Sequence, residues 1–187
     1  MTIRAGLIQE IELLIDIDND ASTLFEAAGL RLDAARDLEV TLAARERWMK
    51  CVSAGTVLVA VSQFCELMGF AAVAERDGEL YLDQLSVRRG FMRQGVGTEL
   101  LHAAMKLAMQ MGGHSLWLTT YDHLSWNRPY YERHGFVVIR AEALGPQMRE
   151  ELSFERRLLP DPEHRIVMRS RLPAVVVRPS GSLAHSV

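Results

Sequence analysis

The chain has 187 residues, of which 49% are hydrophobic and 24% are charged, with 13 Gly, 6 Pro and 2 Cys. This is the composition of an ordinary globular protein, and it excludes a collagen, a disulfide scaffold and a broadly disordered chain. No apolar run reaches the ~18 residues of a membrane span, and a formal net charge of −3 disfavours a dedicated nucleic-acid binder.

The length predicts a single domain, which we place at residues 1–172, followed by a flexible tail at 173–187 rich in Pro, Ser, Gly and Ala. Two cysteines and no signal-like N-terminus lead us to expect a cytoplasmic protein that does not associate with membranes. Residues 1–80 carry 7 basic and 14 acidic side chains, whereas residues 81–187 carry 14 basic and 10 acidic side chains. Such asymmetry is expected of a cleft for two oppositely charged ligands, and equally of a random surface distribution.

Hydrophobic periodicity predicts two helices and then three strands in the first half of the chain. The helices are expected at about 10–29 and 38–53, and the strands at 56–61, 67–75 and 79–87. Asp77-Gly78 is a strong hairpin signal between the last two strands. The three closely spaced strands therefore predict an antiparallel meander.

The third of these strands contains a change of hydrophobic phase. Leu80 and Leu82 share one parity, while Leu85 and Val87 share the other. One extra residue at Asp83-Gln84, a β-bulge, would return all four side chains to the same face and leave backbone groups unpaired. A strand buried on both faces explains the same pattern, so both readings stay open.

In the second half, a glycine-rich turn precedes a long helix, and further strands and helices follow. We expect the helix to run to about residue 111, and we expect strands at 115–121, 136–141 and 165–172, a short helix at 126–134 and weak helicity at 150–159. A strand, a glycine turn and a helix N-terminus together make an anion site, because the first helical N–H groups are free. A cap without any ligand is the alternative.

Two familiar phosphate loops do not match this turn. A Walker loop would need Lys before Ser or Thr, but Gly97 precedes Thr98 directly. A dinucleotide fingerprint would need a third small residue where Leu100 stands, and a parallel sheet in place of hairpins.

The turn resembles the acetyl-CoA-binding motif of the GNAT superfamily of N-acetyltransferases. The matching segment reads Val87-Arg88-Arg89-Gly90-Phe91-Met92-Arg93-Gln94-Gly95-Val96-Gly97. Asn127 and the run Tyr131-Glu132-Arg133-His134-Gly135-Phe136 are similar to the second half of the same fold. Met92 stands where the family has Arg or Gln, a departure that affects side-chain contacts more than the backbone anion site.

The resemblance implies an α/β (α+β) fold with a mixed, mostly antiparallel central sheet, helices on both faces and a bulged strand near Asp83-Gln84. It also implies transfer of an acetyl group from the co-substrate acetyl-CoA to an amine. The residues that it assigns to acetyl-CoA binding are Leu85, Ser86, Val87, Arg93, Gln94, Gly95, Val96, Gly97, Thr98, Asn127 and Tyr131.

The resemblance further assigns Tyr131 as the acid that protonates the CoA thiolate. A core tyrosine is the alternative role, and Tyr130 is a neighbour that is easily confused with it. Asn127 would bond the cofactor arm, cap a helix, or do both. Asp83, at the suspected bulge, is our first choice of general base and substrate residue, with an exposed strand position as the alternative.

The acceptor pocket in this family lies at the first two helices, where we select Phe25 and Asp20. The acidic residues of that region are Asp16, Asp18, Asp20, Glu26, Asp33 and Asp37. They favour a cationic amine, either a small molecule or a peptide amine, although a solvated helix face accounts for them equally well.

We expect no metal, because the six His residues lack i, i+4 pairing on a helix. Cys51 and Cys65 are expected to be core thiols. Paired C-terminal strands would make a homodimer. The alternative function is a non-catalytic acyl-CoA-binding regulatory module, and an RNA-acetylating enzyme is disfavoured by the charge.

Overall fold

The computed structural model describes residues 1–173, so the predicted tail lies outside the described residues except for Pro173. The strands are β1 (Thr2–Ala5), β2 (Val57–Val61), β3 (Leu67–Arg76), β4 (Glu79–Val87), β5 (Ser115–Tyr121), β6 (Val137–Ile139) and β7 (Arg165–Arg171). The α-helices are α1 (Ile11–Ala27), α2 (Ala34–Ser53), α3 (Val96–Gln110), α4 (Arg128–Arg133) and α5 (Pro146–Leu158). None of the helices within these residues is long and apolar enough to cross a membrane.

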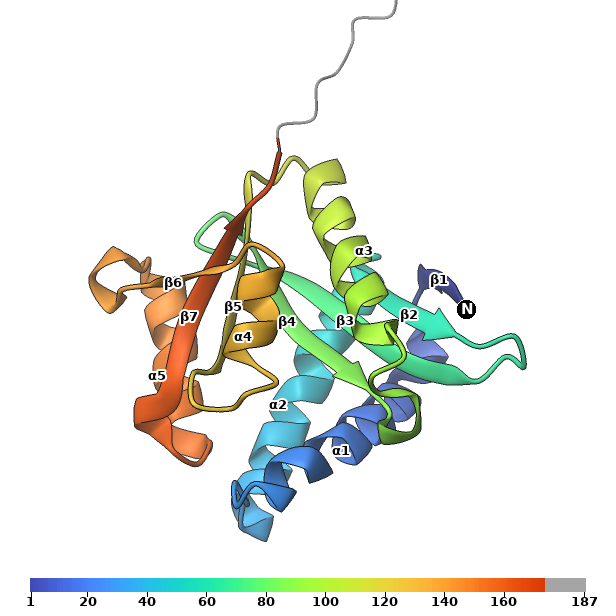
Figure 1. Cartoon of the computed structure of the whole chain (residues 1–187), viewed down its shortest axis with the longest axis horizontal. Helices are drawn as coiled ribbons and strands as arrows, with labels where there is room; N and C mark the ends of the chain where they lie inside the picture. Colours follow the sequence, from blue (N-terminus) through green and yellow to red (C-terminus); the bar gives the residue numbers. More distant parts are fainter. Residues whose placement is uncertain (174–187) are drawn as a thin grey trace, which may run out of the picture.

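The seven strands form one mixed sheet in the order β1-β2-β3-β4-β5-β7-β6 (Figure 1). Every neighbouring pair is antiparallel except β4 and β5. Helix α3 packs on one face of the sheet, in a cluster with Leu80 and Leu82 of β4. Helices α1 and α2 pack on the other face, where Trp48 of α2 contacts Phe70 of β3. The predicted mixed sheet with helices on both faces is confirmed.

The predicted bulge is present in β4. Ala72 of β3 pairs with Gln84 and Val73 pairs with Leu82, so Asp83 is the extra residue. All four apolar residues of β4 then contact the cluster under α3, namely Leu80, Leu82, Leu85 and Val87. Tyr81, which is 1% exposed, packs in a separate cluster with Trp117, so the strand is buried on its other face as well. The phase change itself comes from the bulge, because the four apolar residues share one face.

Element boundaries differ from the sequence expectations where a distant or short-range cap acts. Helix α2 begins at Ala34, not at residue 38, because the Asp33 carboxylate accepts hydrogen bonds from the N–H groups of Ala35 and Arg36. Strand β1 was not predicted, since four residues give little periodicity, and it forms by pairing with β2. Helix α4 and strand β6 are shorter than expected.

The two cysteines are free but differ in environment. Cys51 is buried beside α1 and the sheet, and burial raises the pKa of its thiol. Cys65 is exposed in the β2–β3 turn, so the expectation of a core thiol is wrong for this residue. A turn residue with φ of 63° has no inward-facing position to occupy.

The β3–β4 turn caps helix α5 from 70 residues away. The Asp77 carboxylate accepts hydrogen bonds from the N–H groups of Gln147 and Met148, both 3.0 Å, and Asp77 N–H donates to Gln147 Oε1 at 2.7 Å. Helix α5 consequently begins at Pro146, four residues before the predicted start. This contact joins the central hairpin to the C-terminal half of the fold.

Replacing Asp77 with Ala is expected to lower the free energy of unfolding by about 1–2 kcal/mol, because two N–H groups of α5 lose their acceptor. Asp77→Asn is the matched control and should cost less, since Asn keeps one acceptor oxygen and tolerates the residue's φ of 56°. Urea unfolding of both variants measures the difference. Equal losses of unfolding free energy in the two variants would mean that the hydrogen bonds between Asp77 and α5 do not stabilise the protein.

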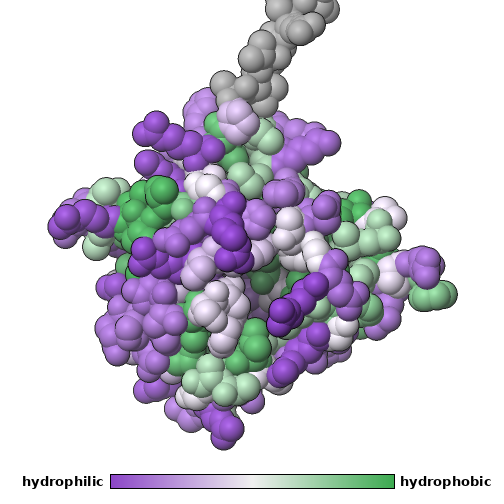
Figure 2. Space-filling model, in the orientation of Figure 1, coloured by the Kyte–Doolittle hydropathy of each residue, from purple (hydrophilic) through white to green (hydrophobic). Residues whose placement is uncertain are grey.

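Strand β6 forms an exposed edge. Val137 is 57% exposed and Val138 is 40% exposed, and a hydrophobic patch lies over this strand on the face shown in Figure 2. A second copy of the chain would cover such an edge, and the homodimer stays a prediction.

Candidate active site

The sheet opens where β4 and β5 separate. Their register contains only two pairs, Leu80 with Leu116 and Tyr81 with Trp117. Beyond these pairs, the edge of β4 that faces β5 has no partner strand within residues 1–173. A cleft of about 1440 Å³ occupies this gap, lined by α1, α2, β4, the start of α3, β5, α4 and α5.

Most of the predicted acetyl-CoA residues line this cleft. They are Leu85, Ser86, Val87, Arg93, Gly95, Gly97, Thr98, Asn127 and Tyr131. Gln94 and Val96 do not line it: the Gln94 side chain bonds the Gly90 carbonyl, and the Val96 side chain is in the core. For these two residues only the backbone is available to a ligand.

The start of α3 has the features of an anion site. Gly95 precedes the helix with a φ of 85°, and no side chain caps the first turn. The N-terminal dipole of this 15-residue helix favours negative charge. Arg89, Arg93 and Met92 line the cleft at the preceding loop, so two guanidinium groups add to the positive potential. Arg93 itself has a φ of 61°, a strained conformation of the kind found at binding loops.

Substituting Gly95 with Ala is expected to cost about 1–2 kcal/mol of stability, because an L-residue is strained at this φ. No atom lies within 4 Å of the position of the new Cβ, so the cost is conformational and not steric. Gly90→Ala is the control, since its surroundings are also open and its φ is not in the left-handed region. Thermal unfolding and calorimetric titration with CoA should detect a loss in the Gly95 variant alone; similar losses in both would contradict this assignment.

Tyr131 and Tyr130 lie side by side on α4, with ring centroids 5.1 Å apart. Burial, and then the neighbouring Tyr130, raise the pKa of Tyr131 well above its usual value. The Tyr130 hydroxyl is buried without a hydrogen-bond partner among the described residues, 3.5 Å from the position that a Cβ on Gly97 would take. Both side chains line the cleft, so lining the cleft does not distinguish Tyr131 from Tyr130 as the candidate acid.

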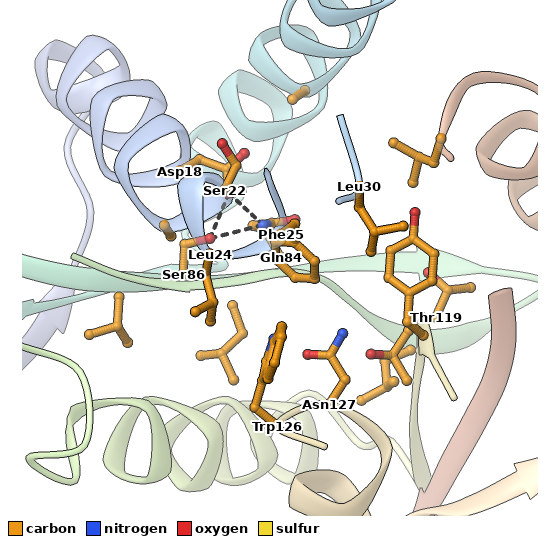
Figure 3. A pocket seen from close by; sticks show the side chains of 18 of the residues that line it. Asp18, Ser22, Leu24, Phe25, Leu30, Gln84, Ser86, Thr119, Trp126 and Asn127 are labelled. Carbon is orange, nitrogen blue, oxygen red and sulfur yellow. Dashed lines mark hydrogen bonds between the residues drawn. The ribbon is translucent and has the colours of Figure 1, made fainter. Parts of the chain in front are cut away.

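Asn127 stands at the start of α4 but does not cap it with its side chain. Its backbone carbonyl accepts hydrogen bonds from Tyr130 and Tyr131, which fixes the turn. The amide points into the cleft opposite β4 (Figure 3). Of the two roles considered for Asn127, side-chain capping is therefore excluded, and the amide is available to a ligand.

Asp83 does not have the environment of a general base. Its side chain is 1% exposed and ion-pairs with Arg47 at 3.0 Å and Arg76 at 3.3 Å. Trp48 Nε1–H donates a third bond to the same carboxylate at 3.0 Å. These three donors already occupy the oxygens of this carboxylate, although the residue is among those that line the cleft. The role of Asp83 as base and substrate residue stays a prediction, and its pairing with two arginines disfavours it.

Asp83 belongs to a chain of ion pairs, in which Arg76 contacts both Asp83 and Glu151 and Arg47 contacts Asp83. Arg165 and Glu155 form a separate ion pair at 2.7 Å. Burial raises the pKa of Glu151, although Arg47 and Arg76 oppose the shift. These ion pairs join α2, β3, β4, α5 and β7, and each of the three carboxylates contacts at least one guanidinium group.

Asp20 also differs from its predicted role. Its carboxylate accepts a hydrogen bond from the Arg89 backbone N–H at 2.6 Å, and it is not among the residues that line the cleft. The helical period explains the difference, since Asp20 is two positions from Asp18 and therefore on another side of α1. Phe25, the other predicted substrate residue, does line the cleft and contacts Tyr121 and Trp126.

Asp18 is the carboxylate that the structure brings into the cleft. Ser86 Oγ–H and Gln84 Nε2–H each donate to its Oδ1 at 2.6 Å (Figure 3). No hydrogen bond to its Oδ2 comes from residues 1–173. Burial raises the pKa of Asp18, opposed by these two bonds and by Arg47. In sequence, Asp18 was only one member of an acidic helix, and no pattern separated it from its neighbours.

The bulge explains why two residues of β4 reach Asp18. With Asp83 as the extra residue, Gln84 and Ser86 both face α1 while Leu85 and Val87 face α3. The strand thus presents polar side chains to one helix and apolar side chains to the other.

Comparisons with known proteins agree with this architecture. Residues 12–136 match the sequence model of the "Acetyltransferase (GNAT) family". The fold is similar to the PaiA N-acetyltransferase of Thermoplasma acidophilum, solved with coenzyme A, at a TM-score of 0.69 and 16% identity over 91% of this chain and 98% of that one. The fold is also similar to a GNAT-family acetyltransferase of Staphylococcus aureus, with a TM-score of 0.68 and 14% identity over 92% of this chain and 99% of that one.

The fold is also similar to part of a longer protein. N-acetylglutamate synthase of Neisseria gonorrhoeae, solved with coenzyme A and N-acetyl-glutamate, matches with a TM-score of 0.63 and 18% identity. The match covers 92% of this chain and 35% of that one.

Proposed function

Since the chain belongs to the GNAT acetyltransferase family, we propose that it transfers the acetyl group of acetyl-CoA to a cationic primary amine. The observation that carries the proposal is the cleft between β4 and β5, which has Asp18 on one side and Tyr131 on another. An uncapped helix N-terminus and two arginines at the same cleft suit the pyrophosphate of CoA.

In the proposed reaction the amine nitrogen attacks the thioester carbonyl carbon, and a tetrahedral oxyanion forms. A backbone N–H on the unpaired edge of β4 would donate to that oxyanion, an interaction worth about 3–4 kcal/mol. The C–S bond then breaks, and the thiolate of CoA takes the proton of Tyr131. Before the attack, the ammonium form of the acceptor loses one proton to Asp18 through Oδ2, which frees the lone pair of the nitrogen. After the attack the nitrogen loses its second proton to water, and the Tyr131 phenolate regains a proton from water.

Three carboxylates support a positively charged acceptor. Asp18 and Glu26 lie on α1 and Asp37 lies on α2, and all three line the cleft. These helices belong to the acidic half of the sequence. Glu151 and Glu155 line it as well but are paired with arginines. An acceptor with a second positive charge would therefore meet a favourable potential on this side of the cleft.

Release of free CoA thiol, measured across a panel of amines, tests the proposal. The sharpest comparison is 1,4-diaminobutane against 4-aminobutanoate, which share a chain length and differ in the charge at the far end. We expect kcat/KM to favour the diamine by about tenfold or more at low salt, and the ratio to shrink as ionic strength rises. A preference for the carboxylate would contradict the cationic acceptor. CoA binding without thiol release for any amine would instead indicate the acyl-CoA-binding module.

A further inference from the structure

A cluster of metal-ligating side chains lies outside the cleft, where β5 ends and β7 begins. The last pair of these strands is Tyr121 with Arg165. Asp122 and His164 continue that register by one residue each, and Asp122 N–H donates to the His164 carbonyl at 3.0 Å. The two side chains are therefore held on adjoining strand ends by backbone hydrogen bonds, and not on a free loop.

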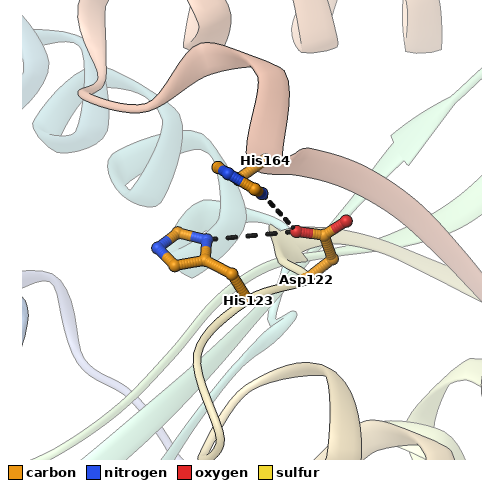
Figure 4. A group of neighbouring side chains, drawn as sticks. All are labelled: Asp122, His123 and His164. Carbon is orange, nitrogen blue, oxygen red and sulfur yellow. Dashed lines mark hydrogen bonds and ion pairs between the residues drawn. The ribbon is translucent and has the colours of Figure 1, made fainter.

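Three ligand atoms converge there. His164 Nδ1 lies 2.8 Å from Asp122 Oδ1, and His123 Nδ1 lies 3.9 Å from the same oxygen (Figure 4). Two ligands of a tetrahedral zinc ion lie about 3.3 Å apart when their bonds to the metal are about 2.0–2.1 Å long. The observed separations fall on either side of that value, so small side-chain rotations would place one ion between the three atoms.

The second nitrogen of His123 also has the partner that a metal-bound imidazole uses. Nε2 lies 3.6 Å from the Asp161 carboxylate. This distance is too long for a hydrogen bond, but a small side-chain shift would let the carboxylate accept from Nε2–H and so orient the ring. Asp161 is itself fixed to the cluster, because its carbonyl accepts a hydrogen bond from His164 N–H at 3.0 Å.

Exposure and ligand type indicate the class of ion. The side chains of Asp122, His123 and His164 are 31%, 30% and 41% exposed, so an ion can enter and water can complete its coordination. Two imidazoles and one carboxylate suit a borderline ion such as Zn²⁺, whereas Mg²⁺ and Ca²⁺ prefer oxygen ligands alone.

We propose that Asp122, His123 and His164 form a binding site for Zn²⁺ or a similar divalent transition metal, with Asp161 orienting His123. The cluster meets three requirements of a metal site: its ligand atoms lie within 4.8 Å of one another, a carboxylate lies near one ring, and backbone hydrogen bonds hold two of the ligands in place. The sequence expectation of no metal considered only histidines on one helix face. Here the ligands come from two strand ends that are 42 residues apart in sequence.

Binding would act on the loop that leads to the candidate active site. Residues 122–127 connect β5 to α4, and this loop ends at Asn127. The His123 ring lies 5.5 Å from Tyr121, whose hydroxyl donates to the Pro160 carbonyl at 2.7 Å. A metal that binds both His123 and His164 would hold the loop at residues 122–127 against the segment at residues 160–164, which Tyr121 already contacts through Pro160.

The test is titration of tag-free protein with Zn²⁺ by calorimetry, in a Cys65→Ser background that removes the exposed thiol. We expect one Zn²⁺ per chain, a rise in thermal stability on binding, and no response to Mg²⁺. His164→Ala and Asp122→Ala should each weaken binding by about tenfold or more. His114→Ala, which alters a histidine outside the cluster, should leave affinity unchanged.

His123→Ala guards against misfolding of the other two variants, because this side chain lies in an exposed loop. It should also weaken binding, and the d–d absorption of Co²⁺ in place of Zn²⁺ should lose intensity with it. Absence of binding at micromolar Zn²⁺, or equal affinity in the folded cluster variants and in His114→Ala, would overturn the proposal.

Discussion

Replacing Tyr131 with Phe is expected to lower kcat by roughly 10²–10⁴-fold while leaving the affinity for CoA almost unchanged. The change deletes only the hydroxyl, so the packing of the ring against Phe136 stays. The raised pKa of Tyr131 keeps its proton in place until the thiolate departs. Steady-state thiol release gives kcat, and calorimetric titration with CoA gives the affinity.

Tyr130→Phe is the matched control, because it removes the adjacent hydroxyl from the same helix. That hydroxyl is buried without a partner among residues 1–173, so its loss should be neutral for stability or favourable. We expect kcat to change by no more than about threefold, a loss far smaller than that of a general acid. If the two variants lost activity equally, or Tyr130→Phe lost more, Tyr131 would not be the acid.

Replacing Asp18 with Asn should lower kcat/KM for the amine by about 10²–10⁴-fold and leave CoA affinity unchanged. The Asn amide oxygen can still accept from Ser86 and Gln84, so the local hydrogen bonds are kept. What is lost is the group that accepts a proton from the amine. Measuring kcat/KM with saturating acetyl-CoA isolates this effect.

The dependence on pH provides a second readout for Asp18. A base must be ionised, so activity should fall as the pH drops through the pKa of Asp18, which burial raises from its usual value. Asp18→Asn should lack this acidic limb and keep the limb caused by protonation of the amine itself. An unchanged pH profile in the variant would show that another group limits the rate.

Stability separates a catalytic loss from a folding defect in this variant. A carboxyl whose pKa is raised on folding contributes stability that is present below its unfolded pKa and is lost as pH rises through its folded pKa. Above its folded pKa the ionised Asp18 therefore costs stability, and in that pH range Asp18→Asn should be at least as stable as the wild type. Asp20→Asn, on the same helix but outside the cleft lining, should retain activity.

The sequence predicted the sheet well because its signals are local. The phase change between Leu82 and Leu85 located the bulge, and Asp77-Gly78 located the turn of the hairpin. Strand β1 and the start of α5 were missed because each depends on a partner far along the chain, β2 in one case and Asp77 in the other. Short elements with remote partners leave little periodicity of their own.

The site was predicted less evenly, and the reason is the pairing of charges. Residues of the candidate anion site such as Gly95 and Gly97 could be predicted to line the cleft, because the glycine turn marks them in the sequence. We propose Asp18 in the role that the sequence suggested for Asp83, because Arg47 and Arg76 pair with Asp83 while the hydrogen bonds to Asp18 come from neutral donors. No spacing in the sequence shows which carboxylate will meet a guanidinium group after folding.

The short pairing between β4 and β5 has a consequence for the free protein. Only two residue pairs join these strands, so the amides on the open edge of β4 are left to water where a sheet would normally protect them. A cofactor arm that bonds this edge would act as the missing strand. We expect CoA to slow hydrogen exchange at Leu82–Val87 far more than at the fully paired β7. On this proposal, the same open edge of β4 that receives the arm of CoA becomes ordered only when CoA is bound.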